Sequence, residues 1–175
     1  MNKRMLLAVL AAVMVLVPVS EVAAQDPREP AAEEAIALFK QADSSLVDWF
    51  DNAYGYAVFP NVGKGGLGVG GAHGKGLVYK GGEVVGKTSL TQFTVGLQLG
   101  GQVYQQVIFF EDEASYNNFT GGNFELSAQA SAIAAAAGVA ANATYRYGVA
   151  IFTLGKTGLM YEASVGGQKF SFTPI

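Results

Sequence analysis

Residues 62–100 read VGKGGLGVGGAHGKGLVYKGGEVVGKTSLTQFTVGLQLG, and this glycine-dense stretch decides the fold. Across positions 93–100, apolar residues occupy every second place, with polar residues or glycine between them. A period of two is typical of a strand that buries one face. Earlier in the stretch, Gly66, Gly68 and Gly70 fall on alternate positions, so one strand face carries no side chains there. Such a bare face indicates the close approach of another backbone, a large side chain or a ligand.

Helices are predicted on both sides of this block. From Ala32 to Ala53, apolar residues recur at three- and four-residue steps, which is a helical pattern. Asp43-Ser44-Ser45 interrupts it, and Ser45 with Asp48 resembles a capping box, so two short helices are expected. After the block ends at Phe110, three acidic residues precede a further apolar pattern that stops at Gly121-Gly122. Acidic residues favour a first helical turn, so we predict a third, short helix here.

The other segments are predicted to be strands and turns. Turns are expected at 61–63, 72–74 and 80–82, where glycine clusters with turn-forming residues. Residues 124–143 have the alanine content of a helix, but they alternate and contain Gly138, which weakens a helix by about 1 kcal/mol. We favour strands there, and further strands at 145–152, 159–165 and 169–172. The predicted fold is α+β: an antiparallel, glycine-rich β-sheet curling toward a barrel, with the N-terminal helices and one short mid-chain helix packed on it.

The ends of the chain indicate one exported domain. Lys3 and Arg4 precede an apolar run, and small residues at 22–24 offer a cleavage site, as in a secretory signal peptide. We expect residues 1–24 to be this peptide, cleaved after Ala24, residues 25–31 to be a short leader, and residues 32–175 to form a single domain. The chain has no cysteine, so disulfides and acyl anchoring through a mature N-terminal cysteine are excluded. A periplasmic or secreted protein is expected.

Charge and motifs exclude several classes of function. The net charge of −3 argues against a nucleic-acid partner. The string from Gly81 to Thr88 matches the P-loop pattern, but the residues after Thr88 alternate like a strand. A P-loop requires a helix at that point, because the amides of its first turn bind the phosphate. We therefore expect no nucleotide partner.

The sequence holds little material for catalysis or metal binding. His73 is the only histidine, so a Ser-His-Asp arrangement would have to use it, and we expect it to be exposed in a glycine turn. One histidine and no cysteine argue against a zinc site. The acidic trio at 111–113 lacks the alternating ligand spacing of a calcium loop. Neither an enzyme, a metal site nor a cofactor is expected.

The remaining signal is a local excess of positive charge. Between residues 61 and 110 the charged side chains are four lysines and one acid, at Lys64, Lys75, Lys80, Lys87 and Glu83. Lysine side chains and free amides at glycine turns together suit a phosphate head group. The alternative is that lysines at turns keep strand edges soluble. Trp49 and Phe50 belong to an aromatic set that suits either a membrane contact or the core under the helices.

Several of these segments together resemble a known family. GYAVFP, KGGLGVGGAHGKGLVY, GLQLGGQ and the late GKTGLMYEASVGG are similar to the SYLF domain, the Ysc84 lipid-binding family, over roughly residues 31–172. The resemblance implies non-enzymatic phospholipid binding at a membrane surface. Eukaryotic members also bundle actin, which a signal peptide would put out of reach. Their basic N-terminal helix assists lipid binding, whereas the matching helix here is acidic. A structural or protein-interaction role in the cell envelope, without a lipid ligand, is the alternative.

Overall fold

The computed structural model describes residues 26–67, 69–95, 101–122, 124–126, 132–133, 140–155, 158–162 and 167–175. The signal peptide expected at residues 1–24 lies outside this part. The elements in chain order are α1 (Glu29–Ala42), α2 (Leu46–Asn52), β1 (Gly55–Leu67), β2 (Val69–Lys80), β3 (Glu83–Val95), β4 (Gly101–Phe110), α3 (Glu113–Thr120), β5 (Glu125–Leu126), β6 (Ala132–Ile133), the 3-10 turn η1 (Ala140–Asn142), β7 (Val149–Gly155), β8 (Gly158–Glu162) and β9 (Gln168–Pro174). The predicted α+β class, rich in strand, is confirmed.

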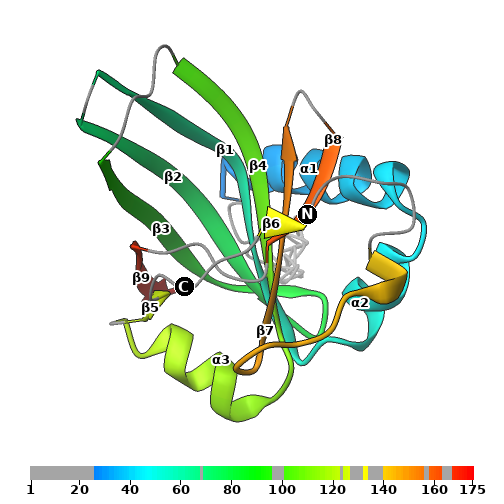
Figure 1. The fold of residues 1–175 in the computed structure, drawn as a ribbon. Helices are drawn as coiled ribbons and strands as arrows, with labels where there is room; N and C mark the ends of the chain where they lie inside the picture. The colour runs from blue at the N-terminus through cyan, green and yellow to red at the C-terminus, as the bar shows by residue number, and fades with distance from the viewer. Residues whose placement is uncertain are drawn as a thin grey trace, which may run out of the picture.

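One antiparallel sheet organises the molecule, with strand order β5-β9-β3-β2-β1-β4-β7-β8-β6. Strands β1 to β4 are the longest, and their far ends extend beyond the helices (Figure 1). The sheet curls strongly, since side chains of β4 and β9 meet although three strands separate them in the sheet. It does not close into a barrel: within the described residues, the end strands β5 and β6 pair only with β9 and β8, respectively.

Helices α1 and α2 cover one face of the sheet, which we call the α1 face. Ala32, Ala35 and Phe39 of α1 pack with strand residues such as Val58 and Leu77 in one buried cluster. These buried residues of α1 are the ones that the three- and four-residue spacing in the sequence predicts. The helix is about 21 Å long, and its strand partners, such as Val58 and Leu77, lie in the part of the sheet nearest the β2–β3 turn.

Helix α3 packs on the opposite face, which we call the α3 face. Phe119 contacts Phe110 and Phe170, with ring centroids 4.8 and 5.3 Å apart, respectively. Three buried glutamines lie in the same interior: Gln106 donates to Gln168 at 3.0 Å, and Gln168 donates to Gln92 at 3.4 Å. Their side chains therefore join β4, β9 and β3 across the curl of the sheet.

Close approach between strands explains the glycines of β2. A Cβ on Gly76 would lie 2.3 Å from the carbonyl oxygen of Val58, and one on Gly74 would lie 2.8 Å from Val62 Cγ2. Both glycines are on the α3 face, next to the register shift where β1 passes from Val58 to Asn61. The bare strand face expected at Gly66, Gly68 and Gly70 is a different segment: Gly66 pairs with Gly70, and Gly68 lies outside the described residues.

Several local predictions are wrong. No turns form at 61–63 and 72–74, because both segments pair continuously within β1 and β2; only the turn at 80–82 forms. Ser45 does not cap α2 through its side chain; its hydroxyl and amide both donate to Asp43 Oδ1. The strand predicted at 145–152 begins only at Val149, because Tyr147 and Gly148 adopt positive φ in a tight turn.

The helix predictions are confirmed elsewhere. Two helices separate at Asp43–Ser45, and α3 begins after Asp112, whose carboxylate accepts a hydrogen bond from the Ser115 amide at 2.8 Å. Within 124–143, the described residues form the two short strands β5 and β6 and the turn η1; the remainder of that segment lies outside the described residues. None of the helices in the described part of the chain has the length and hydropathy needed to cross a bilayer.

Candidate functional site

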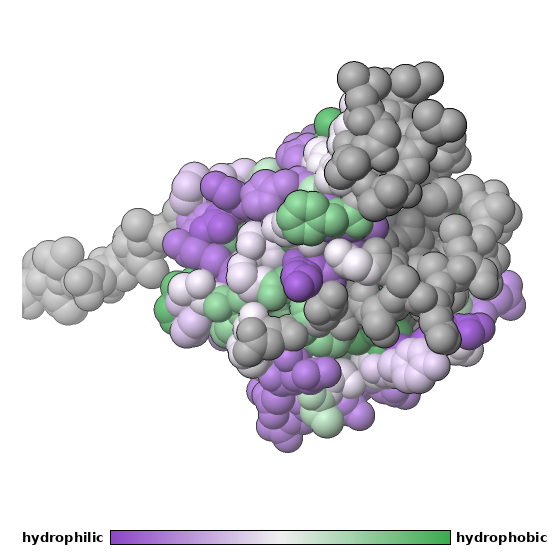
Figure 2. Space-filling view, turned by 60° about the vertical axis from the view of Figure 1, so that its left-hand side comes forward, coloured by the Kyte–Doolittle hydropathy of each residue, from purple (hydrophilic) through white to green (hydrophobic). Residues whose placement is uncertain are grey.

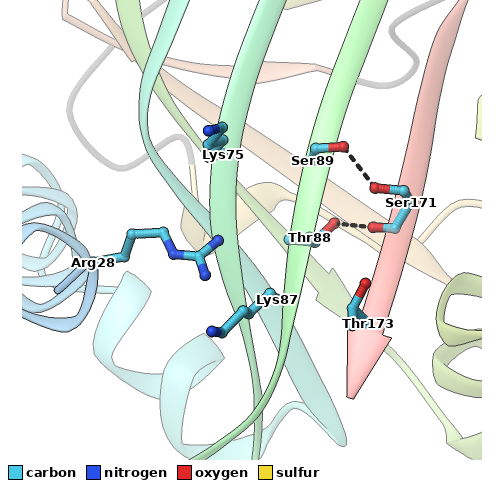
Figure 3. Close-up of a pocket in the computed structure, with 7 residues that line it drawn as sticks. All are labelled: Arg28, Lys75, Lys87, Thr88, Ser89, Ser171 and Thr173. Carbon is cyan, nitrogen blue, oxygen red and sulfur yellow. Dashed lines mark hydrogen bonds between the residues drawn. The ribbon is translucent and has the colours of Figure 1, made fainter. Parts of the chain in front are cut away.

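An open pocket of about 510 Å³ lies on the α1 face, beside the N-terminus of α1. It is lined by three cationic and four hydroxyl side chains: Arg28, Lys75, Lys87, Thr88, Ser89, Ser171 and Thr173. Figure 3 shows Arg28 reaching from the start of α1 toward β2 and β3, with the hydroxyl groups on β3 and β9 beyond it. Elements that are distant in sequence therefore converge on one cationic pocket.

Strand register places the two lysines on the same face. Lys87 of β3 pairs with Leu77 of β2, which is buried under α1, and Lys75 lies two residues before Leu77. Side chains at i and i+2 in a strand point to the same side. Arg28 joins them because the helix that begins at Glu29 covers this side of the sheet.

Asp26 is the carboxylate that pairs with these cations. Arg28 donates to it through Nε at 2.8 Å and through Nη2 at 2.9 Å, and Lys87 Nζ lies 2.8 Å from its Oδ2. The Asp26 side chain is only 5% exposed. Hydrogen bonds from Arg28 and then from Lys87 hold the pKa of Asp26 well below its usual range, and the same pairing raises the pKa of Arg28. Asp26 offsets one of the three cations, and the Glu29 carboxylate, which accepts from the Asp26 amide at 3.0 Å, borders the same cluster, so the group keeps a formal charge of +1.

Ser89, Ser171 and Thr173 carry the hydroxyl groups on the α1 face, whereas Thr88 pairs with Gly76 and Phe172 and its side chain lies on the α3 face. Ser89 and Ser171 share a hydrogen bond of 2.6 Å between their Oγ atoms, and Thr88 Oγ1 donates to the Ser171 carbonyl at 2.7 Å (Figure 3). Hydroxyl groups can donate to an anionic oxygen as well as accept. Cationic side chains beside such hydroxyls are the groups that bind a phosphate or another oxyanion.

Sequence comparison relates the chain to a known family. The sequence model of Ysc84, described as a Las17-binding protein and actin regulator, matches residues 91–173. The chain is also 33% identical over 153 residues to Beta cell expansion factor A of Aeromonas veronii. Residues 91–173 belong to the Ysc84 family. The resemblance inferred from the glycine-rich segments is confirmed.

The Ysc84 family is associated with binding functions. Proteins of this family are known as binding domains linked to lipids and actin-regulating partners, rather than as enzymes. The alignment with Beta cell expansion factor A covers 80% of this chain and 58% of that protein, so the chain spans a little over half of its relative. The matched segment 91–173 includes β9, and so contributes Ser171 and Thr173 to the pocket of this Ysc84 domain.

The structure brings together two of the four lysines singled out in the sequence. Lys75 and Lys87 line the pocket, whereas Lys64 and Lys80 do not. Lys64 pairs with Ala72, a core residue of the α3 face, so it points to the other side of the sheet. Lys80 lies at the β2–β3 turn, where its Nζ sits 4.7 Å from the centre of the Tyr54 ring; contact with Tyr54 raises the pKa of Lys80.

The two aromatic candidates for a membrane contact pack under α2. Phe50 is buried against Tyr56 and Phe109, with ring centroids 5.1 and 4.8 Å away. Trp49 contacts Phe109 at 5.6 Å, and its Nε1 donates to the Ala140 carbonyl at 3.0 Å. In this conformation both side chains serve the interface between α2 and the sheet.

The P-loop-like string forms a hairpin. Gly81 and Gly82 adopt φ of +60° and +83° in the turn, and Thr88 lies within β3, paired with Phe172. The strand predicted after Thr88 is confirmed, so no helix N-terminus follows the string. His73 is exposed as expected, but it lies in β2, 3.5 Å from the Thr91 hydroxyl. The described residues contain no group of three His, Cys, Asp or Glu side chains placed to hold a metal.

Sequence reasoning missed Arg28 and Asp26. Both lie in the segment interpreted as a short leader, next to Pro27, and neither belongs to a motif. Their role depends on α1 packing against β1 and β2, which local sequence does not specify. A signal was present nonetheless, since Asp26 comes shortly before a helix with Pro30 near its first position, where an acidic residue is favourable.

Proposed function

We propose that this protein is an exported, non-enzymatic phospholipid-binding domain. In this proposal Arg28, Lys75 and Lys87 hold the phosphate of an anionic head group, and Ser89 and Ser171 donate to its oxygens. The observation that supports it is the meeting of three cationic side chains, from the start of α1, β2 and β3, with a single paired carboxylate at one open pocket. Membership of a family linked to lipids supports the same conclusion.

The partner is proposed to be a common anionic phospholipid of the cell envelope. Residues 1–24 have the pattern of a signal peptide, and cleavage after Ala24 would leave Asp26 and Arg28 in the mature chain. Export would separate the protein from both actin and phosphoinositides. Intact mass measurement of protein purified from the envelope tests this step, with a mature chain that begins at Gln25 as the expected result.

Liposome flotation tests head-group binding. The mature protein should float with vesicles of phosphatidylglycerol and phosphatidylcholine, and remain at the bottom with phosphatidylcholine alone. A lysine near an anionic surface contributes about 1 kcal/mol, so the double variant Lys75→Gln/Lys87→Gln should bind about 30-fold more weakly. The difference should shrink in high salt, because salt screens exposed charges.

Lys64→Gln/Lys80→Gln is the matched control, since it removes the same charge from the two lysines outside the pocket. Equal losses in the two double variants would show that net charge, rather than the pocket, drives binding. No flotation on any vesicle would favour the alternative, a protein-interaction component of the envelope. Native mass spectrometry of the protein from its own envelope would show a co-purified lipid directly.

A further inference from the structure

We propose that the part of the α1 face beyond helix α1 is an acyl-chain site, continuous with the cationic pocket. One acyl chain of the phospholipid would lie along β1, over a strip of bare backbone, while its phosphate stays at Arg28, Lys75 and Lys87. This inference rests on the proposed head-group site and extends it. It assigns a ligand to a stretch of sheet that helices α1 and α2 leave exposed.

Strand register defines the strip. Gly63 of β1 pairs with Val103 of β4 and with His73 of β2, and the next row on the same face joins Gly65 to Gly101 and Gly71. Because residues paired across antiparallel strands point to the same side, all of these positions share one face. Lys75 is on it too, two residues along β2 from His73.

This face is open above the glycines. Gly63, Gly65 and Gly101 are exposed, and a Cβ added to Gly63 would meet no atom within 4 Å. The α3 face of the same strands differs, because there a Cβ on Gly74 or Gly76 would collide with β1. Among the described residues, Gly63, Gly65 and Gly101 therefore leave an uncovered surface, whereas Gly71 of the same strip lies close to β3 and the glycines of the α3 face allow close packing.

Two exposed apolar side chains border the strip. Phe93 of β3 is 73% exposed and Val103 of β4 is 60% exposed. Three strand spacings separate β3 from β4 in the sheet, which is about 14 Å. A ligand lying between them could cover both side chains, and each Å² of apolar surface removed from water would contribute about 25 cal/mol. Hydrophobic residues reach the surface between hydrophilic ones on the side of the molecule drawn in Figure 2.

Charge complementarity selects the occupant. From the Lys75 row to the Gly71 row is four residues along β2, or about 13 Å. The surface is cationic at one end of that distance, and the remainder consists of glycine backbone, with His73 and Thr91 on one side of it and the side chains of Phe93 and Val103 near its far end. An amphiphile with an anionic head matches both ends. A second copy of this acidic chain would have to present an acid next to an apolar segment, and a neutral apolar partner would leave the cations unused.

Titration with a short-chain lipid distinguishes binding at the strip from binding at the pocket. The ¹⁵N-labelled mature protein is titrated with dioctanoyl phosphatidylglycerol below its micelle concentration, and separately with glycerophosphoglycerol, which has the head group alone. We expect both probes to shift the amides of Lys75, Lys87 and Ser89. Only the lipid should shift those of Gly63 and Gly65. The lipid should also bind at least tenfold more tightly, since each shielded methylene contributes up to about fourfold.

A variant that fills the strip with a side chain provides a second test, in which lipid affinity is measured. Gly63→Leu places a side chain in the open space above β1, so it should weaken lipid binding about tenfold and leave glycerophosphoglycerol binding unchanged. Asn118→Leu is the control, because it adds a leucine at an exposed position of α3, which packs on the other face.

The outcomes distinguish the two proposals. Pocket shifts with both probes, without shifts in the strip, would overturn the acyl-chain site and leave head-group binding intact. The acyl-chain site is equally overturned if Gly63→Leu and Asn118→Leu bind lipid equally well, or if Gly63→Leu dissociates a dimer seen by sedimentation. Absence of any pocket shift with either probe would overturn the head-group site itself.

Discussion

The two faces of the central sheet are built from alternate residues of the same strands, yet they differ in what covers them. The α3 face is closed by aromatic rings and by the Gln92–Gln168–Gln106 chain, and these side chains are buried. Among the described residues, α1 and α2 cover only part of the α1 face, and beyond them it presents cations, hydroxyls, glycines and the exposed side chains of Phe93 and Val103. Both faces therefore contain a buried cluster that stabilises the fold, and the α1 face in addition keeps surface available for binding.

Truncation of an aromatic ring should show the largest contrast between the faces. Phe119 is fully buried against three rings of the α3 face, so Phe119→Ala should lower the free energy of unfolding by about 4 kcal/mol. Phe93→Ala, on the exposed part of the α1 face, should change it by less than about 0.5 kcal/mol. Urea unfolding followed by circular dichroism measures both. Similar losses would mean that the α1 face is covered in solution.

Substituting glycines on the two faces should also have different effects on stability. Gly76→Ala puts a methyl group 2.3 Å from a backbone oxygen of β1, so we expect a loss of about 3 kcal/mol. Gly63→Ala meets nothing and removes backbone freedom from the unfolded chain, so it should be neutral or stabilise by about 0.5 kcal/mol. Thermal unfolding of the two variants under identical conditions tests the pair. A loss at Gly63 as large as that at Gly76 would contradict the open strip.

The buried glutamines test the polar part of the α3 face. Gln168 and Gln106 have no exposed surface and exchange hydrogen bonds, so Gln168→Leu leaves Gln106 without this partner. The expected loss is about 2 kcal/mol, because a buried polar group left without a partner carries its full desolvation cost. Replacing all three glutamines by leucine should cost less than this single change. A triple variant that is far less stable would indicate that the glutamines also bind water.

The smallest effect is a pH dependence on the α1 face. Asp26 has a pKa in the folded protein below its value in the unfolded chain, so its contribution is present above about pH 4 and is lost only as the pH falls through the lower folded value. The contact between Asp26 and Lys87 should therefore persist at about pH 4. Carboxyl ¹³C titration should show a low pKa in the native protein and a higher one in Lys87→Gln. An unchanged pKa in this variant would show that Arg28 alone holds the carboxylate.

Much of the fold follows from patterns within short segments. The helical steps before Ala53, the alternation from Phe93 onward and the Gly81-Gly82 turn each predicted an element, and the described residues form the helices, the end of β3 and the turn. The turns predicted at 61–63 and 72–74 are wrong because glycine has two uses. It permits a turn, but in β1 and β2 it permits close strand contact and an open surface instead. A single sequence does not distinguish these uses, since the neighbouring strand decides between them.

The candidate site was only partly predictable. Excess positive charge between residues 61 and 110 indicated an anion site, and two of its four lysines, Lys75 and Lys87, line the pocket. Lys64 points to the opposite face of the sheet from Lys75 and Lys87. Counting alternate residues along β1 does not predict this, because the register of β1 shifts between Val58 and Asn61. Asp43 shows the same limit in the core: it accepts from the Ala140 amide 97 residues away, at 3.0 Å, and no local motif indicates this contact.

The sequence by itself determined the helices before the sheet, the strand-forming glycine block and the family, because these depend on residues close together in the chain. Tertiary structure alone decided which glycines are crowded and which are open, and which cations share a pocket. Those outcomes depend on how α1 packs against β1 and β2 and on how far the sheet curls. Both are set by packing among distant residues, where apolar burial has no directional preference and the detailed fit of side chains selects one arrangement.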